Sequence, residues 1–313
     1  MRKSSPASST FACGNPPTAH REEVGHAPLS YLVHALDAPD RLAGCGSSAR
    51  GYDGRMKKVT AFVGSARKQH TYQATRRFFD HLEAGGGIET EIVMLSDYAL
   101  QPCRGCKLCF ENGEGACPLH DDRDALIEKL DRSDGVVFAS PSYMFQVSGW
   151  MKTWIDRLAF VGHRPRFFGK AFTNIVVQGL PLDAKIGKYL NLVGSCFGFA
   201  PVRGSHHTAR EPMTKREARK LDDSLSAHSR RFRSALARTH PPTPNLTMLI
   251  GFRIGRTTMR LELDDRSCDY RYFREKGWFD AAYYYPARLG PLKRFVGWLF
   301  DIVAARMVRR RTD

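Results

Sequence analysis

The amino-acid sequence predicts an α/β protein built around a doubly wound parallel sheet. From residue 56 onward, short apolar runs rich in β-branched residues alternate with amphipathic segments, as expected of strands joined by helices. Five such runs precede residue 210, enough for one open sheet with helices on both faces. The composition of the 313 residues, 42% hydrophobic and 26% charged, is that of a folded chain and excludes wholly disordered or collagen-like classes.

The apolar runs and the amphipathic segments give the elements in order. We expect strands at residues 59–64, 88–95, 135–139, 172–177 and, as an extended segment, 201–207. We expect the helices between them at residues 71–83, 122–131, 148–160 and from residue 183 onward. Thr214 and Glu217 have the spacing of a capping box, which predicts the start of a fifth helix. Its apolar face carries Ala218, Leu221, Leu225, Phe232 and Leu236.

Two flanking regions differ in composition from this central part. Residues 1–55 are rich in Ser, Ala, Gly, Pro and Arg, and only residues 29–36 resemble a short element, so we expect a mostly disordered extension. Met56, followed by two lysines and the first apolar run, is a candidate start of translation; the alternative is a regulatory or targeting arm. After the break HPPTPNL the alternation stops, which predicts an appendage at residues 240–313 beside a domain at residues 56–239.

The appendage ends in an amphipathic segment at residues 291–311. Its apolar positions include Phe295, Trp298, Leu299 and Ile302, and lysines and arginines flank them. We expect this helix to pack against a partner subunit in a homo-oligomer or to make peripheral contact with a membrane surface. Packing on its own domain is the alternative.

The charge and the cysteine count limit the partners and the compartment. Lys and Arg outnumber Asp and Glu by 48 to 32, and the net charge of +16 attracts nucleotides, nucleic acid or acidic lipid without choosing among them. No apolar run approaches the roughly 20 residues of a membrane-spanning helix. The first residues contain no apolar signal segment, so we expect a cytoplasmic protein whose eight cysteines are reduced thiols.

The loop after the first predicted strand has the residues of a phosphate-binding site. It reads GSARKQHT at residues 64–71, which brings hydroxyl groups, a guanidinium and backbone N–H groups to a helix N-terminus. The pattern is neither the P-loop G-x-x-x-x-G-K-[ST] nor the Rossmann G-x-G-x-x-G. A plain basic turn is the alternative for this loop taken alone.

The loop after the third predicted strand is apolar and aromatic. Pro141, Tyr143 and Phe145 would form a flat wall beside backbone donors, which suits an aromatic heterocycle, although an ordinary packed turn has the same composition. Residues 178–180 form a short third loop. Because ligands of open parallel sheets bind at the carboxyl ends of the strands, we expect these loops to share one site.

Four cysteines lie between these loops. Cys103, Cys106, Cys109 and Cys117 have the spacing C-x2-C-x2-C-x7-C, and four thiolates so close together can ligate one metal centre. Zinc is disfavoured because structural zinc sites usually pair two separate knuckles. Free or redox-active thiols are the third interpretation.

Taken together, the two loops and the segment PCRGCKLCFENGEGACPLHDD resemble the flavodoxin-like NADPH-dependent FMN reductase family over roughly residues 57–237. The resemblance implies a five-stranded sheet of order 2-1-3-4-5 and FMN as the cofactor. By position, Ser65, Arg67 and Thr71 would hold the FMN phosphate. The flavin ring would be lined by Pro141, Ser142, Tyr143, Met144 and Phe145. The cysteine spacing resembles that of iron–sulfur flavoproteins, a branch that holds a [4Fe-4S] cluster beside FMN.

We therefore expect an FMN-dependent oxidoreductase that takes hydride from NAD(P)H and reduces a quinone, a flavin, a nitro or azo compound, or a protein. No catalytic side chain is expected, because the flavin carries the hydride chemistry. Two alternatives belong to other classes: an iron–sulfur flavoprotein electron carrier without NAD(P)H activity, and a basic protein bound to membrane or nucleic acid. The strong positive charge disfavours the carrier, and no nucleic-acid-reading motif is present, so no nucleic-acid partner is expected.

Overall fold

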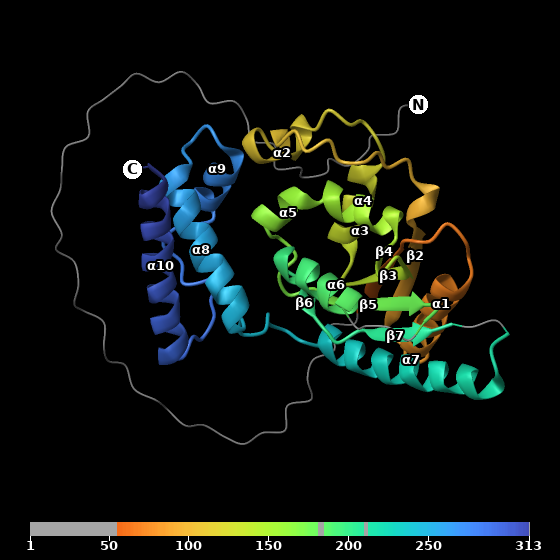
Figure 1. Ribbon diagram of the computed structural model, residues 1–313. Helices are drawn as coiled ribbons and strands as arrows, with labels where there is room; N and C mark the ends of the chain where they lie inside the picture. The colour runs from red at the N-terminus through yellow and green to blue at the C-terminus, as the bar shows by residue number, and fades with distance from the viewer. Residues whose placement is uncertain (1–54, 181–184, 210–211, 313) are drawn as a thin grey trace, which may run out of the picture. The chain divides into compact units, whose positions relative to one another are not determined.

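A parallel sheet with helices on both faces lies at the centre of the described residues, which are 55–180, 185–209 and 212–312 of the computed structural model (Figure 1). The strands are β1 (Lys57–Val63), β2 (Ile88–Met94), β3 (Gly135–Tyr143), β4 (Gln146–Val147), β5 (Ala171–Gln178), β6 (Ala200–Pro201) and β7 (Ser205–Thr208). Their order is β2-β1-β3-β5-β6, with β7 parallel to β5 and β4 antiparallel to β3. The predicted doubly wound order 2-1-3-4-5 is confirmed, with β5 as its fourth strand. The predicted element at residues 29–36 lies outside the described residues.

The fifth strand of this order is divided into β6 and β7. The first half ends at Pro201, and the N–H group of Val202 just beyond it still donates to the Phe172 carbonyl oxygen at 2.7 Å. Gly204 then passes so close to β5 that a Cβ on it would lie 2.3 Å from the carbonyl oxygen of Asn174. The strand resumes at Ser205, with His206 exposed and His207 buried on opposite sides, as alternation along a strand requires.

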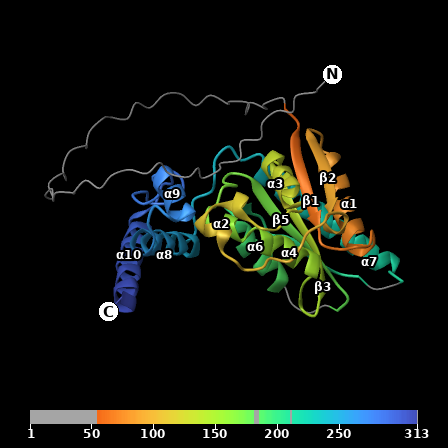
Figure 2. The same cartoon turned by 90° about the horizontal axis from the view of Figure 1, so that it is seen from above.

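The strands are buried on both faces and separate two apolar layers. Figure 2 shows helices on both faces of the sheet. On one face, the ring of Phe62 stacks on Trp154 with 5.5 Å between centroids. On the other face, α1 (His70–Glu83) and α7 (Lys215–Leu236) pack together over the strands. A polar contact lies inside this second layer. His228 of α7 is fully buried, and its Nε2 and Nδ1 atoms lie 2.7 and 3.0 Å from the hydroxyls of Thr173 and Ser205.

The helices follow the predicted order with two differences: a short helix in the cysteine segment was not predicted, and one predicted helix is divided. The remaining helices of this part are α2 (Leu108–Glu111), α3 (Arg123–Arg132), α4 (Gly149–Arg157), α5 (Ala159–His163) and α6 (Lys185–Cys196). The single helix predicted at 148–160 is two helices, because the chain leaves helical geometry at the buried Leu158, where φ is −100° and ψ is 11°. The predicted capping box is confirmed, since the Thr214 hydroxyl accepts from the Glu217 N–H and the Glu217 carboxylate accepts from the Thr214 N–H.

The C-terminal part is helical and aromatic. It consists of α8 (Leu246–Glu262), α9 (Cys268–Glu275) and α10 (Pro291–Thr312). Trp278 and Tyr283, which lie in the aromatic segment between α9 and α10, pack with Phe252 of α8 in a separate apolar cluster. Helices α8 and α10 lie along one another, so α10 packs within its own chain. In the part of the chain that the structure describes, no helix is long and apolar enough to span a bilayer. The division of the chain at residues 239/240 stays a prediction.

Candidate functional site

The loop after β1 leads into the N-terminus of α1. Ser65 is buried, and its hydroxyl donates to the Arg67 carbonyl oxygen at 3.0 Å, whereas the Arg67 side chain is exposed. Helix α1 begins at His70 with no side-chain cap from Gln69 and no acidic residue in its first turn. Thr71, in that turn, is buried. A helix N-terminus of this kind carries partial positive charge and N–H donors, so it favours an anion.

Gly64 brings this loop against the segment that follows β3. Its N–H group donates to the Ala139 carbonyl oxygen at 2.8 Å. A Cβ on Gly64 would lie 2.6 Å from the Ser148 hydroxyl oxygen and 2.8 Å from Met151 Cβ, so a larger residue would force these groups apart. Ser148 caps α4, since its hydroxyl accepts from the Met151 N–H at 3.2 Å. The two loops are therefore in direct contact.

The segment after β3 is a tight hairpin, where the sequence predicted a loop between a strand and a helix. Ser142 pairs with Val147 across it, and Met144 and Phe145 form the turn with φ values of 46° and 64°. Left-handed backbone in residues other than glycine is strained and recurs at functional sites. Pro141 is buried at the base. The tip is exposed: Tyr143 by 54%, Met144 by 88% and Phe145 by 66%. The hairpin thus presents apolar side chains at the carboxyl edge of the sheet.

Two further loops reach the same edge. The hydroxyl of Ser96, which follows β2, donates to the carbonyl oxygen of Ser65 at 3.4 Å. Gln178, at the end of β5, accepts the Ala209 N–H at 2.9 Å, and Leu180 beyond it is exposed. The structure thus brings the loops after β1, β2 and β3 together, as expected for a ligand site of an open parallel sheet.

All four cysteines of the quartet line one cavity of about 140 Å³. Cys103 and Cys106 are exposed, while Cys109 and Cys117 are half-buried. The chain turns through the left-handed region at Gly105 and Lys107, with φ of 65° and 64°. The Gly105 N–H lies 3.5 Å from Cys103 Sγ and donates to it.

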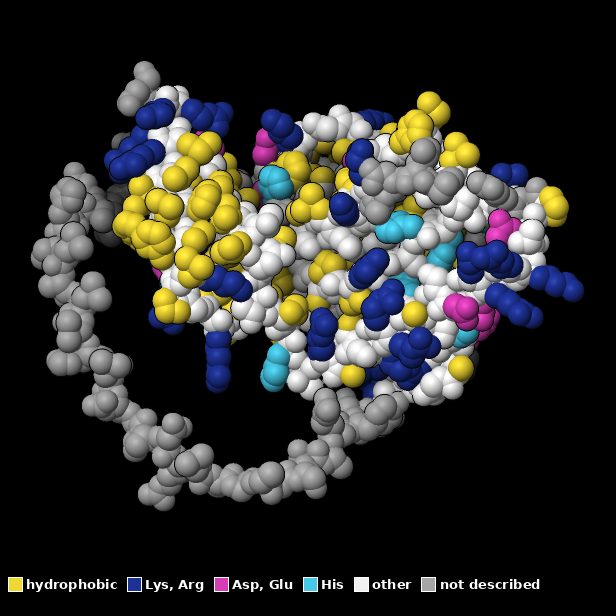
Figure 3. Space-filling view, turned by 60° about the horizontal axis from the view of Figure 1, so that its bottom comes forward, with side chains coloured by type: hydrophobic (Ala, Val, Ile, Leu, Met, Phe, Trp, Pro, Cys, Tyr) yellow, Lys and Arg dark blue, Asp and Glu magenta, His cyan; other side chains and the backbone are white. Residues whose placement is uncertain are grey.

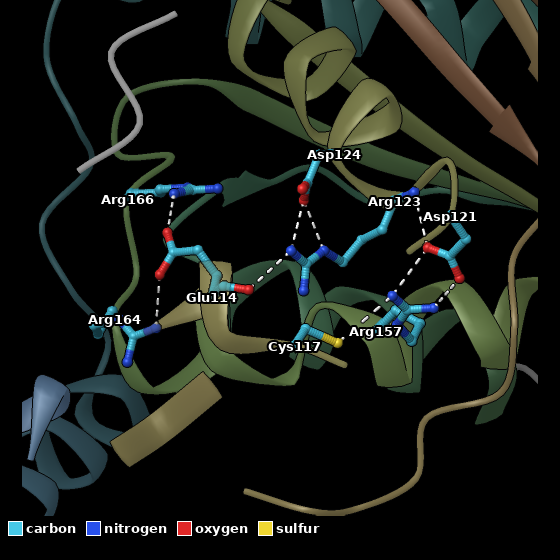
Figure 4. A network of polar contacts seen from close by, with 8 residues as sticks. All are labelled: Glu114, Cys117, Asp121, Arg123, Asp124, Arg157, Arg164 and Arg166. Carbon is cyan, nitrogen blue, oxygen red and sulfur yellow. Dashed lines mark hydrogen bonds and ion pairs between the residues drawn. The ribbon is translucent and has the colours of Figure 1, made fainter. Parts of the chain in front are cut away.

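A buried ion pair between Arg157 and Asp121 lies at one side of this cavity (Figure 4). The guanidinium of Arg157, at the end of α4, bonds both carboxylate oxygens of Asp121, and the two side chains are 1% and 2% exposed. Asp121 also accepts the N–H groups of Gln101 and Arg123 at 3.0 and 3.2 Å. Burial disfavours the charged form, but these hydrogen bonds, with that from Arg157 the strongest, outweigh it and lower the pKa of Asp121. Arg157 also lies 3.8 Å from Cys117 Sγ.

Arg164 joins the cysteine segment to the C-terminal part. Its guanidinium donates to the Cys109 carbonyl oxygen and to the Glu114 carboxylate, each at 2.9 Å, and it also pairs with Asp269 of α9. Arg164 and Asp269 are both buried. Figure 4 shows Arg164 and Arg166 on either side of the Glu114 carboxylate, the second pair being 3.2 Å. The second half of the segment is therefore fixed by buried charges, whereas Cys103 and Cys106 remain exposed.

The four thiols of the cavity are suitable ligands for a metal centre, but their side chains are not arranged around one point. Four thiols in one cavity are a suitable donor set for an iron–sulfur cluster. Within residues 55–180, 185–209 and 212–312, however, no three Cys, His, Asp or Glu side chains are arranged to hold one metal ion. Burial raises the pKa of Cys109, the nearby Arg164 charge opposes this shift, and the other three cysteines add to it. Cluster ligation would require the exposed cysteines to move inward.

The loops after β1 and β3 and the cysteine cavity are connected through α4. The hairpin leads into its N-terminus at Ser148, while Asp156 and Arg157 at its other end line the cavity. At a rise of 1.5 Å per residue, the two ends of α4 are about 12 Å apart. Sequence reasoning missed Gly64, Ser96 and the Arg157 pair. Arg157 is one of three charged residues in its helix, beside Lys152 and Asp156, so the sequence did not single it out.

Comparison with known proteins agrees with this arrangement. The family model described as NADPH-dependent FMN reductase matches residues 57–204. An iron–sulfur flavoprotein of Archaeoglobus fulgidus is 37% identical over 46% of this chain and 66% of its own length. YwqN of Bacillus subtilis, whose name describes an NAD(P)H-dependent, FMN-containing oxidoreductase, is 33% identical over 36% of this chain and 67% of its own length. The chain spans between half and two thirds of the first curated relatives, from 51% to 66%.

Solved structures with similar folds are more distant in sequence. The apo form of the NADH:FMN oxidoreductase EmoB is 18% identical, with a TM-score of 0.45 over 61% of this chain and 98% of that one. An FMN-dependent NADH-azoreductase of Bacillus anthracis is 12% identical, with a TM-score of 0.44 over 56% of this chain and 99% of that one. The strand order, the contacting loops and the sequence matches together lead to one conclusion: this chain belongs to the NADPH-dependent FMN reductase family.

Proposed function

We propose that this protein is an oxidoreductase that binds FMN between the loops after β1 and β3 and takes hydride from NAD(P)H. The observation that carries the proposal is the contact of Gly64 with Ser148. Through it, an N-terminus suited to an anion and a hairpin tip of exposed aromatic and apolar side chains share one edge of the sheet. FMN combines these two chemistries, a phosphate and a flat heterocycle. The family assignment supports the same cofactor.

The residues of the chain then have distinct tasks. Arg67, Ser65 and Thr71 would bind the phosphate through the guanidinium, the hydroxyls and the N–H groups of the first turn of α1. Pro141, Ser142, Tyr143, Met144 and Phe145 would pack along the ring. Bound FMN would supply two-electron hydride chemistry, so the protein needs to hold, orient and shield it and needs no acid or base side chain. The electron acceptor is a quinone, a flavin, a nitro or azo compound, or a protein.

Anaerobic reduction tests this proposal. FMN-loaded full-length protein is mixed with NADPH or with NADH, and the visible flavin absorbance is followed in a stopped-flow instrument. We expect at least one of the two nucleotides to bleach the flavin within seconds. If neither does while dithionite bleaches it fully, the protein is an electron carrier without NAD(P)H activity. The acceptor is then sought by adding a quinone, a nitro compound or free FMN to the reduced protein.

A second centre is favoured by the cysteine cavity. All four thiols of the quartet line it, and several relatives are named iron–sulfur flavoproteins. We propose that Cys103, Cys106, Cys109 and Cys117 hold a [4Fe-4S] cluster after inward movement of the first two. The Gly105 N–H would remain a donor to one sulfur, which stabilises thiolate ligands.

The iron content of the purified protein tests the proposed cluster directly. Protein purified and reconstituted without oxygen should contain about four irons per chain, and each Cys→Ser change in the quartet should lower that content while FMN stays bound. Cys196→Ser is the matched control, because Cys196 is also exposed but lies outside the cavity. Absence of iron after reconstitution would contradict the cluster. Zinc in place of iron would assign the site to a structural metal, and reversible oxidation of the thiols without metal would assign it to redox-active cysteines.

A further inference from the structure

Helix α10 turns small and charged residues toward its neighbour α8. Gly297, Asp301, Ala304 and Val308 repeat at intervals of four, three and four residues, which places them on one face. Gly297 and Ala304 are buried, and a Cβ on Gly297 would lie 2.9 Å from Arg253 Nε. Asp301 pairs with two arginines of α8, Arg253 at 3.1 Å and Arg256 at 2.7 Å. The contact between the two helices therefore uses little of the large apolar surface of α10.

The large apolar side chains of α10 lie on the opposite side. Leu292, Phe295, Trp298 and Leu299 are 69%, 57%, 55% and 40% exposed. A helix that served only to pack on its own chain would turn these residues inward, because each would gain roughly 1.5–3 kcal/mol by full burial. In Figure 3, hydrophobic side chains gather over the C-terminal helices, with Lys and Arg side chains at the margin. A contiguous exposed apolar surface of this kind marks an interaction site.

The charged side chains beside the exposed apolar residues of α10 are positive. Between residues 291 and 311 there are six Lys and Arg residues and a single acidic residue, Asp301, which is paired on the inner face. Arg306 follows Leu299 by seven residues and Arg310 follows four later, so both lie on the outer side of the helix, and both are exposed. The outer face of α10 thus combines apolar and aromatic residues with arginines.

We propose that the outer face of α10 lies in the interface of an anionic bilayer. Leu292, Phe295 and Leu299 would enter the boundary between headgroups and acyl chains, Trp298 would sit at headgroup level, and Arg306 and Arg310 would bind lipid phosphates. Charge selects this occupant over a second copy of the chain, because two copies would bring their arginines together across the contact. The helix lies along the surface and does not cross the bilayer, in agreement with the lack of a spanning helix among the described residues.

Flotation of the full-length protein with vesicles tests the proposal. Vesicles of phosphatidylcholine alone are compared with vesicles that contain phosphatidylglycerol, at low and high salt. We expect partition into the anionic vesicles only, and a lower but still measurable partition coefficient at high salt. At about 1 kcal/mol for each arginine, the double variant Arg306→Gln and Arg310→Gln should lower the partition coefficient about 30-fold. The matched control is Arg216→Gln with Arg219→Gln, two exposed arginines of α7, which should change it by less than about twofold.

The apolar contribution is measured separately. Phe295→Ser with Leu299→Ser should lower partition at least about tenfold at both salt concentrations, because apolar burial is not screened. Leu192→Ser, at an exposed leucine of α6, is its control. Circular dichroism verifies that each variant is folded. The proposal is overturned if the protein does not bind anionic vesicles. It is also overturned if the Arg306 and Arg310 changes lower the partition coefficient no more than the control changes at Arg216 and Arg219. It is also overturned if light scattering shows an oligomer that the Phe295 and Leu299 changes dissociate while vesicle binding is absent, since a second copy would then cover this face.

Discussion

Gly64 and Ser148 lie so close that a Cβ on the glycine would come within 2.6 Å of the serine hydroxyl oxygen. The two residues belong to different loops, one leading into α1 and the other capping α4. Their contact fixes the separation between the proposed phosphate site and the hairpin that follows β3. Any change in this contact should therefore change FMN affinity without touching the cofactor directly.

We expect Gly64→Ala to weaken FMN binding at least about tenfold, because the added methyl group must displace Ser148 or Met151, and overpacking of this kind costs about 1–3 kcal/mol. Fluorescence titration of the apoprotein with FMN measures the change. Gly255→Ala is the control, since a Cβ at Gly255 meets nothing within 4 Å. Equal affinity of the Gly64→Ala variant and the wild type for FMN would show that the two loops do not bind FMN together.

Arg67 is the one strongly charged donor that the family resemblance assigns to the phosphate. Arg67→Ala should weaken FMN binding by about 1.5–3 kcal/mol, the range for hydrogen bonds to charged groups. It should leave the affinity for riboflavin, which has no phosphate, nearly unchanged. Arg77→Ala, at an exposed position farther along α1, controls for the loss of one positive charge. If the Arg67 and Arg77 variants behaved alike, the phosphate would be bound elsewhere.

Arg164 should be a main stabiliser of the contact between the cysteine segment and α9. Arg164→Ala removes the partner of two carboxylates, Glu114 and Asp269, of which Asp269 is buried. Removing one member of a buried ion pair costs about 3–5 kcal/mol, which urea denaturation would register as a lower midpoint. Arg166→Ala, which removes the partly exposed pair with Glu114 and the contacts of its guanidinium with the rings of Phe160 and Phe167, should cost less, about 1–2 kcal/mol. Similar losses from both changes would contradict this assignment.

The buried His228 predicts a loss of stability in mild acid. Burial, reinforced by the charge of Arg231, lowers its pKa to about 3, and burial with the neighbouring His206 lowers that of His207 to about 4. Both rings stay neutral in the folded state, whereas the unfolded chain takes up protons below pH 6.5. Stability is therefore present above pH 6.5 and is lost as the pH falls toward these two values.

Between pH 7 and pH 5, each of the two histidines should lower the free energy of unfolding by about 2 kcal/mol. Urea denaturation at both pH values measures this difference. His228→Gln should reduce the difference between the two pH values by about 2 kcal/mol, even if the variant is less stable at pH 7 because hydrogen bonds to Thr173 and Ser205 are lost. The exposed His120→Gln should leave the dependence unchanged. An undiminished slope in His228→Gln would mean that the ring is not buried as a neutral group.

The fold could be predicted from the sequence because its signals are local. Apolar runs buried on both faces define β1, β3 and β5, and the capping box at Thr214 marks the start of α7. The break at Leu158 could not be predicted, since neither proline nor glycine marks it. The hairpin at Met144 and Phe145 was also missed, because its turn lacks the glycine or asparagine that usually accompanies positive φ.

The candidate site was predictable as a set of loops but not as a set of contacts. Residue types indicated an anion site after β1, an aromatic surface after β3 and a thiol cluster between them. The Gly64 contact and the Arg164 pairs depend on residues far apart in the chain, at separations of 84 and 105 positions, and a single sequence does not reveal such proximity. The amphipathic character of residues 291–311 was recognised, yet only the structure shows that the large apolar residues face outward.

In the proposed function, the loops after β1 and β3 bind FMN through its phosphate and its ring together. The most direct measurement is titration of the full-length apoprotein with FMN, riboflavin and FAD, followed by the quenching of flavin fluorescence. We expect one FMN per chain and binding of riboflavin at least about tenfold weaker, because riboflavin lacks the charged group that Arg67 and the N-terminus of α1 would hold. Equal affinity for FMN and riboflavin, preferred binding of FAD, or no flavin binding would show that these loops do not form a site for FMN.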